Sequence, residues 1–394
     1  MAKWTVMIFM GTEGVEGTAP LDSAADADVA ELGGLTFSPG QELSIWVERH
    51  GFGAPKRDRL GNATTTLTTP NIGTPISTPE AFATGGALES FMKTALEDPG
   101  VPAVALADPS YTMLVLWGHA YDFAFGRSAT RFGIDALDYA ELARVLNTVT
   151  KDGRKLDIIA FDSCSIATLE IAYQFAPYAR YLIASQIGIP LPGWPYDRVF
   201  DRLAEPLGAA MDPLELGSYV VRRYCERYPS QQPVSLSHLD LAQAGSLSVL
   251  TDRLASALAI AMDQDEKEQE LVSQLFMLAQ TADGQPFVDV AALCRLLVRD
   301  SGDADVQAAA KALGDAVLAP VAPAYGPRAP FVIENGFNSI ETAGLSGVSL
   351  YAPNVAPNHD FAAASPFYEK LAFARDTLWR DLVRALALPN QVCC

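Results

Sequence analysis

The chain has 394 residues, of which 49% are hydrophobic and 19% are charged, so it is long enough to bury a sizeable core. Its formal net charge of −19 disfavours nucleic acids and anionic membrane surfaces as general partners, because both require a basic surface. No apolar run reaches the roughly 18 residues of a membrane span, and the first residues lack the features of a signal peptide.

The cysteines are few and odd in number, and their spacing matches neither a disulfide framework nor a zinc site. This usage predicts a reducing, cytoplasmic compartment. The terminal QVCC, with Cys393 and Cys394, is consistent with a lipidation signal or with a dangling tail. The absence of a preceding polybasic segment favours the tail.

Short apolar runs rich in Val, Ile, Leu and aromatic residues predict strands in the first half of the chain. Their hydrophobicity is continuous rather than alternating, which is typical of parallel strands covered on both faces. Helical patterns lie between them, and this alternation predicts an open α/β sheet. The predicted strands are 4–10, 43–48, 112–118, 156–161 and 181–185, and the predicted helices are 85–98, 138–150 and 165–179.

The region 51–80, rich in Gly, Pro and Thr, predicts a long surface excursion. From about residue 200 helical patterns dominate. We therefore expect an α/β core over residues 1–205 and a mostly helical region over 206–394. The predicted helices of the second region are 213–228, 239–264, 286–300 and 304–318, followed by a strand at 347–353 and a closing helix at 365–386.

Polar side chains follow two of the predicted strands, where ligands of open α/β sheets bind. His119 comes directly after 112–118, and Asp162, Ser163 and Cys164 come directly after 156–161. If these strands are neighbours, a histidine and a cysteine meet at one edge of the sheet. Such a pair constitutes a nucleophile and its base.

Cys164 has two interpretations. Most free cysteines are inert, buried residues, and we assign this role to Cys225 and Cys294, which have core-like helical spacing. Cys164, however, precedes a predicted amphipathic helix, whose unpaired N–H groups and positive dipole end would lower the pKa of the thiol. Together with His119, this position favours a reactive thiolate.

The other histidines and the remaining motifs are less informative. His50, His238 and His359 lie where solvent exposure or ordinary hydrogen bonding is expected. No HExxH, CxxC or paired-histidine motif indicates a metal. The stretch GTEGVEG after the first strand superficially resembles a phosphate loop, but it lacks the GxGxxG pattern and no lysine follows. A nucleotide-binding α/β protein is therefore a less favoured alternative.

The residues resemble a known family. KWTVMIFM, LVLWGHA, DIIAFDSCSIATLEIAY and YLIASQIGIPLPGWPYD are similar to segments of the clostripain-like cysteine peptidases, members of the caspase-like group, and so are VSLSHLDLAQ, FVDVAALCRLL, GLSGVSLYAP and FARDTLWRDLV. The interval from position 119 to 164 is close to the ~50 residues that separate the caspase pair. The resemblance implies a caspase-like open, mostly parallel sheet flanked by helices, with the largely helical C-terminal region packed on it.

The resemblance also implies roles for individual residues. Cys164 is similar to the family's nucleophile and His119 to its catalytic histidine. The backbone N–H groups of Cys164 and Ala120 would hold the oxyanion. The family usually has glycine at the position of Ala120, so the added methyl is expected to affect the rate rather than the mechanism.

Asp162 matches the acidic floor of the family's S1 pocket, where a carboxylate would pair with a substrate arginine and, less well, with lysine. The alternative role for Asp162 is an N-cap of the following helix. Ser185, Gln186 and Trp194 fall where the family builds other walls of this pocket. Gln186 replaces a frequent glutamate, which would soften the preference for basic side chains.

Relatives are often zymogens that are cut between the histidine and the cysteine. Arg127 and Arg131 are the basic candidates in this loop, and we favour Arg127 because the small Ser128 suits the P1′ position better than Phe132 does. Some relatives need calcium. A possible calcium set lacks an EF-hand pattern, so a solvated helix face is favoured for it. The set is Asp22, Asp26, Asp28 and Glu31.

The sequence thus predicts a cytoplasmic cysteine endopeptidase that cleaves proteins after Arg, and less well after Lys, with no certain cofactor. Cleavage between His119 and Cys164 would activate it, by itself or by an upstream protease, as part of a proteolytic signalling or defence cascade. The alternative is a weak or inactive homologue that acts as a binding or scaffold module. Ala120 and the softened S1 region support that alternative.

Overall fold

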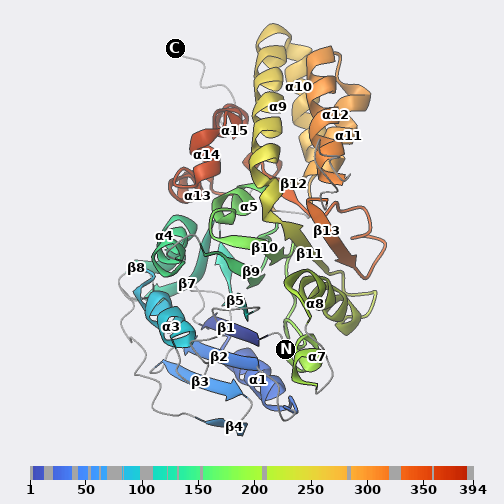
Figure 1. Cartoon of the computed structure of the whole chain (residues 1–394). Helices are drawn as coiled ribbons and strands as arrows, with labels where there is room; N and C mark the ends of the chain where they lie inside the picture. The colour runs from blue at the N-terminus through green and yellow to red at the C-terminus, as the bar shows by residue number, and fades with distance from the viewer. Residues whose placement is uncertain are drawn as a thin grey trace.

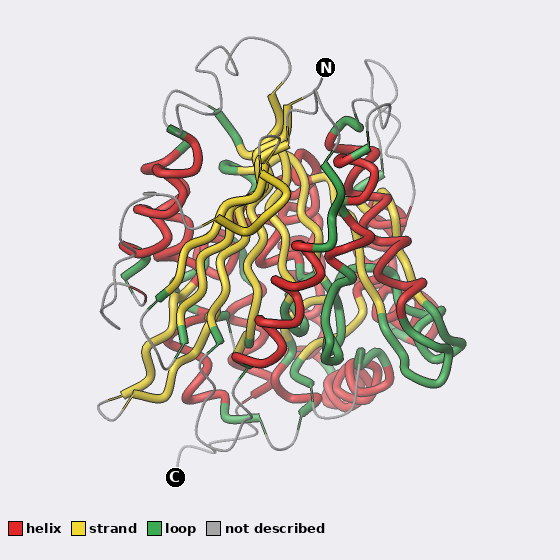
Figure 2. Tube along the Cα trace, turned by 90° about the horizontal axis from the view of Figure 1, so that it is seen from below, coloured by secondary structure: helices red, strands yellow, loops and turns green. Residues whose placement is uncertain are grey.

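The computed structural model describes residues 3–12, 21–37, 43–51, 55–61, 64–68, 82, 84–97, 110–121, 123–130, 133–150, 154–205, 211–281, 285–318, 330–356 and 359–387. Its centre is an open nine-stranded sheet (Figures 1 and 2). In spatial order the strands are β13 (Val332–Phe337), β11 (Ser235–Asp240), β10 (Ala179–Ala184), β9 (Leu156–Asp162), β5 (Ser110–Gly118), β1 (Lys3–Gly11), β2 (Leu43–His50), β3 (Lys56–Gly61) and β4 (Thr64–Thr68).

The middle of the sheet is parallel and its margins are antiparallel. β10, β9, β5, β1 and β2 pair in parallel, which confirms the fold class predicted from their continuous hydrophobicity. β11 and β13 continue the sheet antiparallel to β10, and β3 and β4 continue it antiparallel to β2. The crossovers of the parallel strands cover both faces with helices, as such connections require.

Alternate side chains of the central strands enter two separate cores. Met7 and Phe9 of β1 belong to one core, whereas Val6 and Ile8 belong to the other. Both sets are fully buried, so β1 is covered on both faces at these positions. The first core includes residues of α3 (Gly86–Leu96), α4 (Tyr139–Val149) and α5 (Leu169–Phe175), and the second includes residues of α1 (Asp22–Gly33), α6 (Tyr196–Val199), α7 (Asp201–Ala204) and α8 (Pro213–Arg227).

The margins of the sheet differ from the sequence-based expectation. Part of the predicted excursion at 51–80 is the strand pair β3 and β4. β11 lies where the helix 239–264 was expected to begin, and that helix, α9, extends over Ala244–Gln264 after a short 3-10 turn. β11 buries Ser235, Ser237 and His238 completely, so its hydrophobic pattern is weak. Because β11 and β13 follow residue 205, the sheet crosses the expected boundary between the two regions.

The C-terminal half is mostly helical, as predicted. Figure 1 shows its long helices grouped at one end of the sheet. They are α9, α10 (Glu266–Leu278), α11 (Val290–Asp300) and α12 (Ala304–Leu318). A small sheet of β12 (Phe287–Asp289) and β14 (Ser349–Tyr351) joins them to α5 through a bridge between Thr168 and Ser349. Among the described residues, no helix combines the length and the apolar character needed to cross a bilayer.

The predicted closing helix at 365–386 is in fact three short helices. They are α13 (Phe361–Tyr368), α14 (Ala372–Asp376) and α15 (Trp379–Ala387). Between them, Leu371 and Thr377 adopt extended backbone angles. Buried side chains of all three helices enter the first core, so tertiary packing rather than helical propensity determines where each one ends.

Candidate active site

The pairing of β5 with β9 brings His119 and Cys164 to the same edge of the sheet. The two strands lie side by side, and their last registered pair joins Trp117 to Asp162. The Ser163 hydroxyl then donates a hydrogen bond of 2.6 Å to the carbonyl of Gly118. The residues that follow this bonded pair are His119 and Cys164, and both line the same two cavities. The strand neighbours expected from the sequence are therefore present.

Gly118 permits the close approach of the strands at this point. Its φ is +142°, which side chains rarely adopt, and a Cβ atom there would lie 2.3 Å from the carbonyl oxygen of Gly11. A neighbouring backbone atom cannot move aside as the end of a side chain can. The turn that presents His119 therefore requires glycine before it.

The loop after β9 holds Cys164 rigidly but not at a helix start. The Cys164 thiol is half-buried, and its Sγ accepts a hydrogen bond of 3.3 Å from the Ile189 N–H. Ser165 has a φ of +57°, and its N–H donates to the carbonyl of Ile187 at 3.0 Å. A positive φ in a residue other than glycine marks backbone that the surrounding contacts hold in place.

Helix α5 begins at Leu169, and Thr168 caps it by accepting a hydrogen bond of 3.2 Å from the Ile171 N–H. The expectation that Cys164 directly precedes the helix is therefore wrong. Burial instead raises the pKa of the Cys164 thiol, the Ile189 N–H opposes this effect, and the charge of Asp162 adds to it. Thr168 also replaces Asp162 as the N-cap, which excludes the capping role considered for that aspartate.

Asp162 is buried, with 5% of its surface exposed, and it lines the smaller of the two cavities, which has a volume of about 140 Å³. Its Oδ2 accepts hydrogen bonds from the backbone N–H of Trp194 at 3.1 Å and from the hydroxyl of Tyr196 at 3.2 Å. Burial raises the pKa of Asp162 to about 7 against the effect of these donors. A Cβ atom on Gly193, where φ is +70°, would lie 3.0 Å from the carboxylate.

The other predicted pocket residues lie around this cavity rather than in it. Trp194 contacts Asp162 through its backbone, and its ring is buried. Gln186 is buried and hydrogen-bonds Asp289, Ser349 and Gly347, so it ties the loop to β12 and β14. The Ser185 hydroxyl is buried and donates to the Ile187 carbonyl at 2.9 Å. The residues that line the Asp162 cavity, besides those already named at the strand ends, are Leu21, Ile189, Pro190, Leu191 and Gly193.

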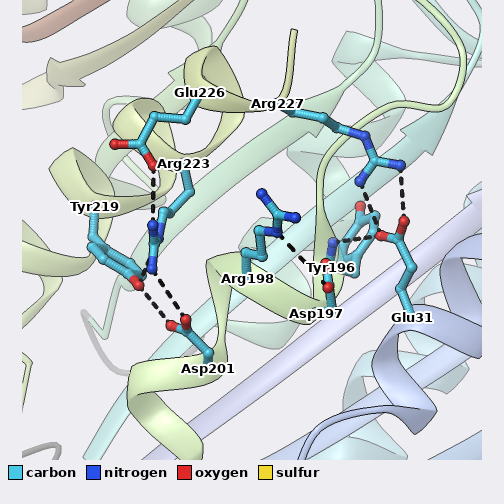
Figure 3. A network of polar contacts seen from close by, with 9 residues as sticks. All are labelled: Glu31, Tyr196, Asp197, Arg198, Asp201, Tyr219, Arg223, Glu226 and Arg227. Atoms are coloured by element: carbon cyan, nitrogen blue, oxygen red, sulfur yellow. Dashed lines mark hydrogen bonds and ion pairs between the residues drawn. The ribbon is translucent and has the colours of Figure 1, made fainter.

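A charged network lies behind Asp162. Two hydrogen bonds, of 2.8 and 3.2 Å, join Arg227 of α8 to the carboxylate of Glu31 on α1, which also accepts the Tyr196 N–H (Figure 3). Asp28 is 1% exposed, and its Oδ2 accepts a hydrogen bond of 2.7 Å from the Trp117 indole. Burial and the charge of Asp162 raise the pKa of Asp28 to about 8. Sequence patterns did not place Asp28 or Arg227 at this site, because the two residues come from helices that are distant along the chain.

The acidic residues considered for calcium all lie on α1, but their carboxylates have different partners. Asp22 accepts from the Thr12 hydroxyl, Asp26 pairs with Arg49, and the partners of Asp28 and Glu31 are given above. Asp28 is therefore not part of a solvated face. Within the described parts of the chain, no three His, Cys, Asp or Glu side chains are placed to hold a metal ion.

The other described histidines and cysteines do not line either of these cavities. His50 bonds Glu48 at 2.8 Å and His359 bonds the Tyr351 hydroxyl at 2.8 Å. His238 is fully buried rather than exposed, and burial lowers its pKa to about 3. Cys225 and Cys294 are free thiols; Cys294 is buried in the first core, as expected, whereas Cys225 is half-buried and packs against the second core. Residues 13–20, which include most of GTEGVEG, and the terminal cysteines lie outside the described residues.

The segment expected to be processed is a small sheet of β6 (Ala120–Tyr121), β7 (Ala124–Thr130) and β8 (Gly133–Asp138). Arg127 is part of β7, whose next residue, Ser128, pairs with Asp135. Arg131 and Phe132 lie outside the described residues. The N–H of Gly126 donates to the carbonyl of His119 at 2.8 Å, so this sheet is attached directly to the segment that contains His119.

Solved structures of other proteins have a similar fold. Over 96% of its length the chain is similar in fold to a secreted C11 cysteine protease from Bacteroides thetaiotaomicron solved with an irreversible peptide inhibitor, with a TM-score of 0.62, 15% identity and 100% of that chain covered. An inactive zymogen C11 protease from Parabacteroides distasonis gives a TM-score of 0.60 at 15% identity, covering 95% of this chain and 97% of that one. At such identities the likeness concerns the fold.

Sequence comparison is more specific. Clostripain from Hathewaya histolytica is 40% identical over 55 residues, which amount to 13% of this chain and 10% of that protein. The clostripain family model matches residues 89–385, a range that includes His119, Asp162 and Cys164. The match extends over most of the chain and agrees with the resemblance seen in its motifs. The chain therefore belongs to the clostripain family of peptidases.

Proposed function

We propose that this chain is a cysteine endopeptidase that cleaves after arginine, and less well after lysine, with Cys164 as nucleophile and His119 as its proton acceptor and donor. The proposal rests on one observation. A single cavity is lined by a cysteine, a histidine and a buried carboxylate, which come from the ends of two adjacent parallel strands. These are the components of a thiol attack on a substrate with a basic side chain.

The chemistry begins from a protonated thiol, because burial raises the pKa of Cys164. His119 takes the thiol proton as Sγ attacks the scissile carbonyl carbon. The carbonyl oxygen becomes negative and is held by the backbone N–H groups of Cys164 and Ala120. When the C–N bond breaks, His119 gives the proton to the leaving amine. Water, deprotonated by His119, then hydrolyses the thioester and regenerates the thiol.

Specificity for arginine rests on Asp162. A guanidinium that enters the cavity presents two parallel N–H donors, and the ionised carboxylate can accept both. Lysine offers a single point charge and binds less well. Gln186 is fully engaged with the neighbouring segment. We therefore assign it a role in holding the loop rather than in softening the preference for basic residues.

Activation by cleavage between His119 and Cys164 is part of this proposal, and the zymogen form of a structural relative supports it. Arg127 lies in a paired strand, and proteases cut chains that have opened locally. Processing at Arg127 would therefore need partial opening of the hairpin, by this enzyme or by an upstream protease. The cytoplasmic setting stays a prediction, which cell fractionation with an antibody against the chain would test.

The experiment compares the wild-type protein with the Cys164→Ala variant and with Cys225→Ala as a matched control. We expect the wild-type and Cys225→Ala proteins to cleave Arg-P1 fluorogenic peptides and not Asp-P1 peptides, and Cys164→Ala to cleave neither. An iodoacetamide probe should label wild-type protein faster than Cys164→Ala. Equal cleavage by wild type and Cys164→Ala would refute the nucleophile. No cleavage and no selective labelling would favour the scaffold alternative.

A further inference from the structure

A second cavity lies on the other side of the dyad and takes no part in the mechanism described above. Its volume is about 260 Å³, and the residues that it shares with the Asp162 cavity are His119 and Cys164. Its walls come from the segments that follow these two residues and from β12. The side chains are largely apolar and include Phe123, Ile166 and Phe287.

Tyr139, the first residue of α4, is one of the residues that line this cavity. The residue is fully buried, and its ring packs edge-on against Phe161 and Phe175. Its hydroxyl has no hydrogen-bond partner among the described residues. By contrast, the hydroxyl of Tyr173 donates to Asp376 at 3.0 Å. A buried hydroxyl without a partner is unfavourable, and a ligand that bonds it recovers that loss.

Because the two cavities adjoin at His119 and Cys164, each one would hold a different side chain of a bound substrate. When the side chain before the scissile bond occupies the Asp162 cavity, the scissile carbonyl lies over Cys164. The chain then continues past His119, which must reach the leaving nitrogen. The next side chain of the substrate therefore lies toward the second cavity, beside the residues that follow His119 and Cys164.

We propose that this second cavity is the S1′ subsite, that it selects an aromatic residue after the scissile bond, and that the Tyr139 hydroxyl hydrogen-bonds a polar group at the tip of that residue. This inference rests on the proposed peptidase function. The apolar walls account for the preference for an aromatic ring, because they exchange water for apolar contact. The hydroxyl accounts for a preference for tyrosine over phenylalanine.

The proposed subsite contradicts the sequence-based preference for Ser128 over Phe132 at the P1′ position. A small residue such as Ser128 leaves the cavity unfilled, whereas an aromatic residue such as Phe132 fills it. Synthetic peptides that copy the Arg127–Ser128 and Arg131–Phe132 sequences therefore form a matched natural pair. We expect the Arg–Phe peptide to be the better substrate.

The test uses internally quenched peptides with arginine before the scissile bond and tyrosine, phenylalanine or serine after it. For the wild-type protein we expect kcat/KM to fall about fivefold from tyrosine to phenylalanine, as for one neutral hydrogen bond. From phenylalanine to serine we expect a further fall of about tenfold or more, as for burial of one aromatic side chain. In Tyr139→Phe the tyrosine-to-phenylalanine ratio should fall to about 1 or lower. Tyr173→Phe, a matched change outside the cavity, should keep the wild-type ratio.

Two results would overturn the subsite. One is equal cleavage of the serine and phenylalanine peptides by the wild-type protein. The other is a tyrosine-to-phenylalanine ratio that Tyr139→Phe leaves unchanged. A wild-type protein that cuts none of the three peptides would instead overturn the proposed peptidase function, and the subsite with it. Because Tyr139→Phe removes only an unpartnered hydroxyl, its melting temperature should match that of the wild type and serves as the folding control.

Discussion

Asp162→Asn tests the assignment of arginine specificity most directly. The substitution removes the charge but keeps the shape and one carbonyl oxygen. That oxygen can still accept the N–H of Trp194, the backbone contact that Asp162 makes at 3.1 Å. Asp162→Ala would leave both the Trp194 N–H and the Tyr196 hydroxyl without an acceptor, so loss of activity in that variant could reflect a disturbed loop.

The expected magnitude follows from the burial of the carboxylate. Removing one partner of a buried, hydrogen-bonded charge pair costs about 2–5 kcal/mol, or roughly 30-fold to several thousand-fold in kcat/KM. At pH 8 most of Asp162 is ionised, because its pKa is about 7. The folded protein should not lose stability at this pH, since the variant also removes a buried charge whose desolvation opposes folding.

The assay compares arginine and citrulline before the scissile bond at pH 8. Citrulline has nearly the shape of arginine but no charge. We expect Asp162→Asn to lose activity toward arginine within the range above and to change less than threefold toward citrulline, with an unchanged melting temperature. An equal loss for both substrates would refute the charge pairing, because it would show that Asp162 acts on the dyad or the loop instead.

Two further predictions concern pH. For wild-type protein, kcat/KM toward the arginine peptide should rise as pH increases through about 7, where Asp162 loses its proton. The pH profile for the citrulline peptide should lack this rise, and identical profiles for the two peptides would contradict the prediction. Burial also raises the pKa of Asp28 from 3.8 to about 8, so the folded state binds a proton more tightly than the unfolded state does, and wild-type stability falls as pH rises from about 4 to 8. Asp28→Asn, which keeps an acceptor for the Trp117 indole, should therefore be more stable than wild type at pH 9 in urea titrations, by up to about 6 kcal/mol, and should match it near pH 4. A difference that does not change with pH would show that the Asp28 carboxyl does not carry the effect.

The sequence by itself determined the central sheet and the meeting of His119 with Cys164. Short continuous apolar runs that alternate with helical patterns are typical of parallel strands buried on both faces, and the carboxyl ends of such strands share one edge. Family membership was equally readable, because the motifs around both residues are specific. These features depend on local patterns, and local patterns are visible along a chain.

The tertiary structure decided the features that depend on contacts between distant segments. The start of α5 at Leu169 follows from hydrogen bonds between residues 163–168 and the loop near Ile187, so the sequence misplaced the helix relative to Cys164. The strand β11 has buried serines and a buried histidine, which conceal its pattern.

The two cavities also depend on contacts between segments that are distant along the chain. Asp28 and Arg227 come from helices on one face of the sheet and lie near Asp162. Tyr139 comes from the other face, yet it lines a cavity with His119 and Cys164. Burial then changes what these groups can do, since it raises the pKa of Asp162 and leaves the Tyr139 hydroxyl without a partner. Residue types and spacing thus predicted which side chains meet at the sheet edge. Packing decided the pKa values of Asp162 and Cys164 and the shape of the two cavities, because both depend on how much water the fold excludes.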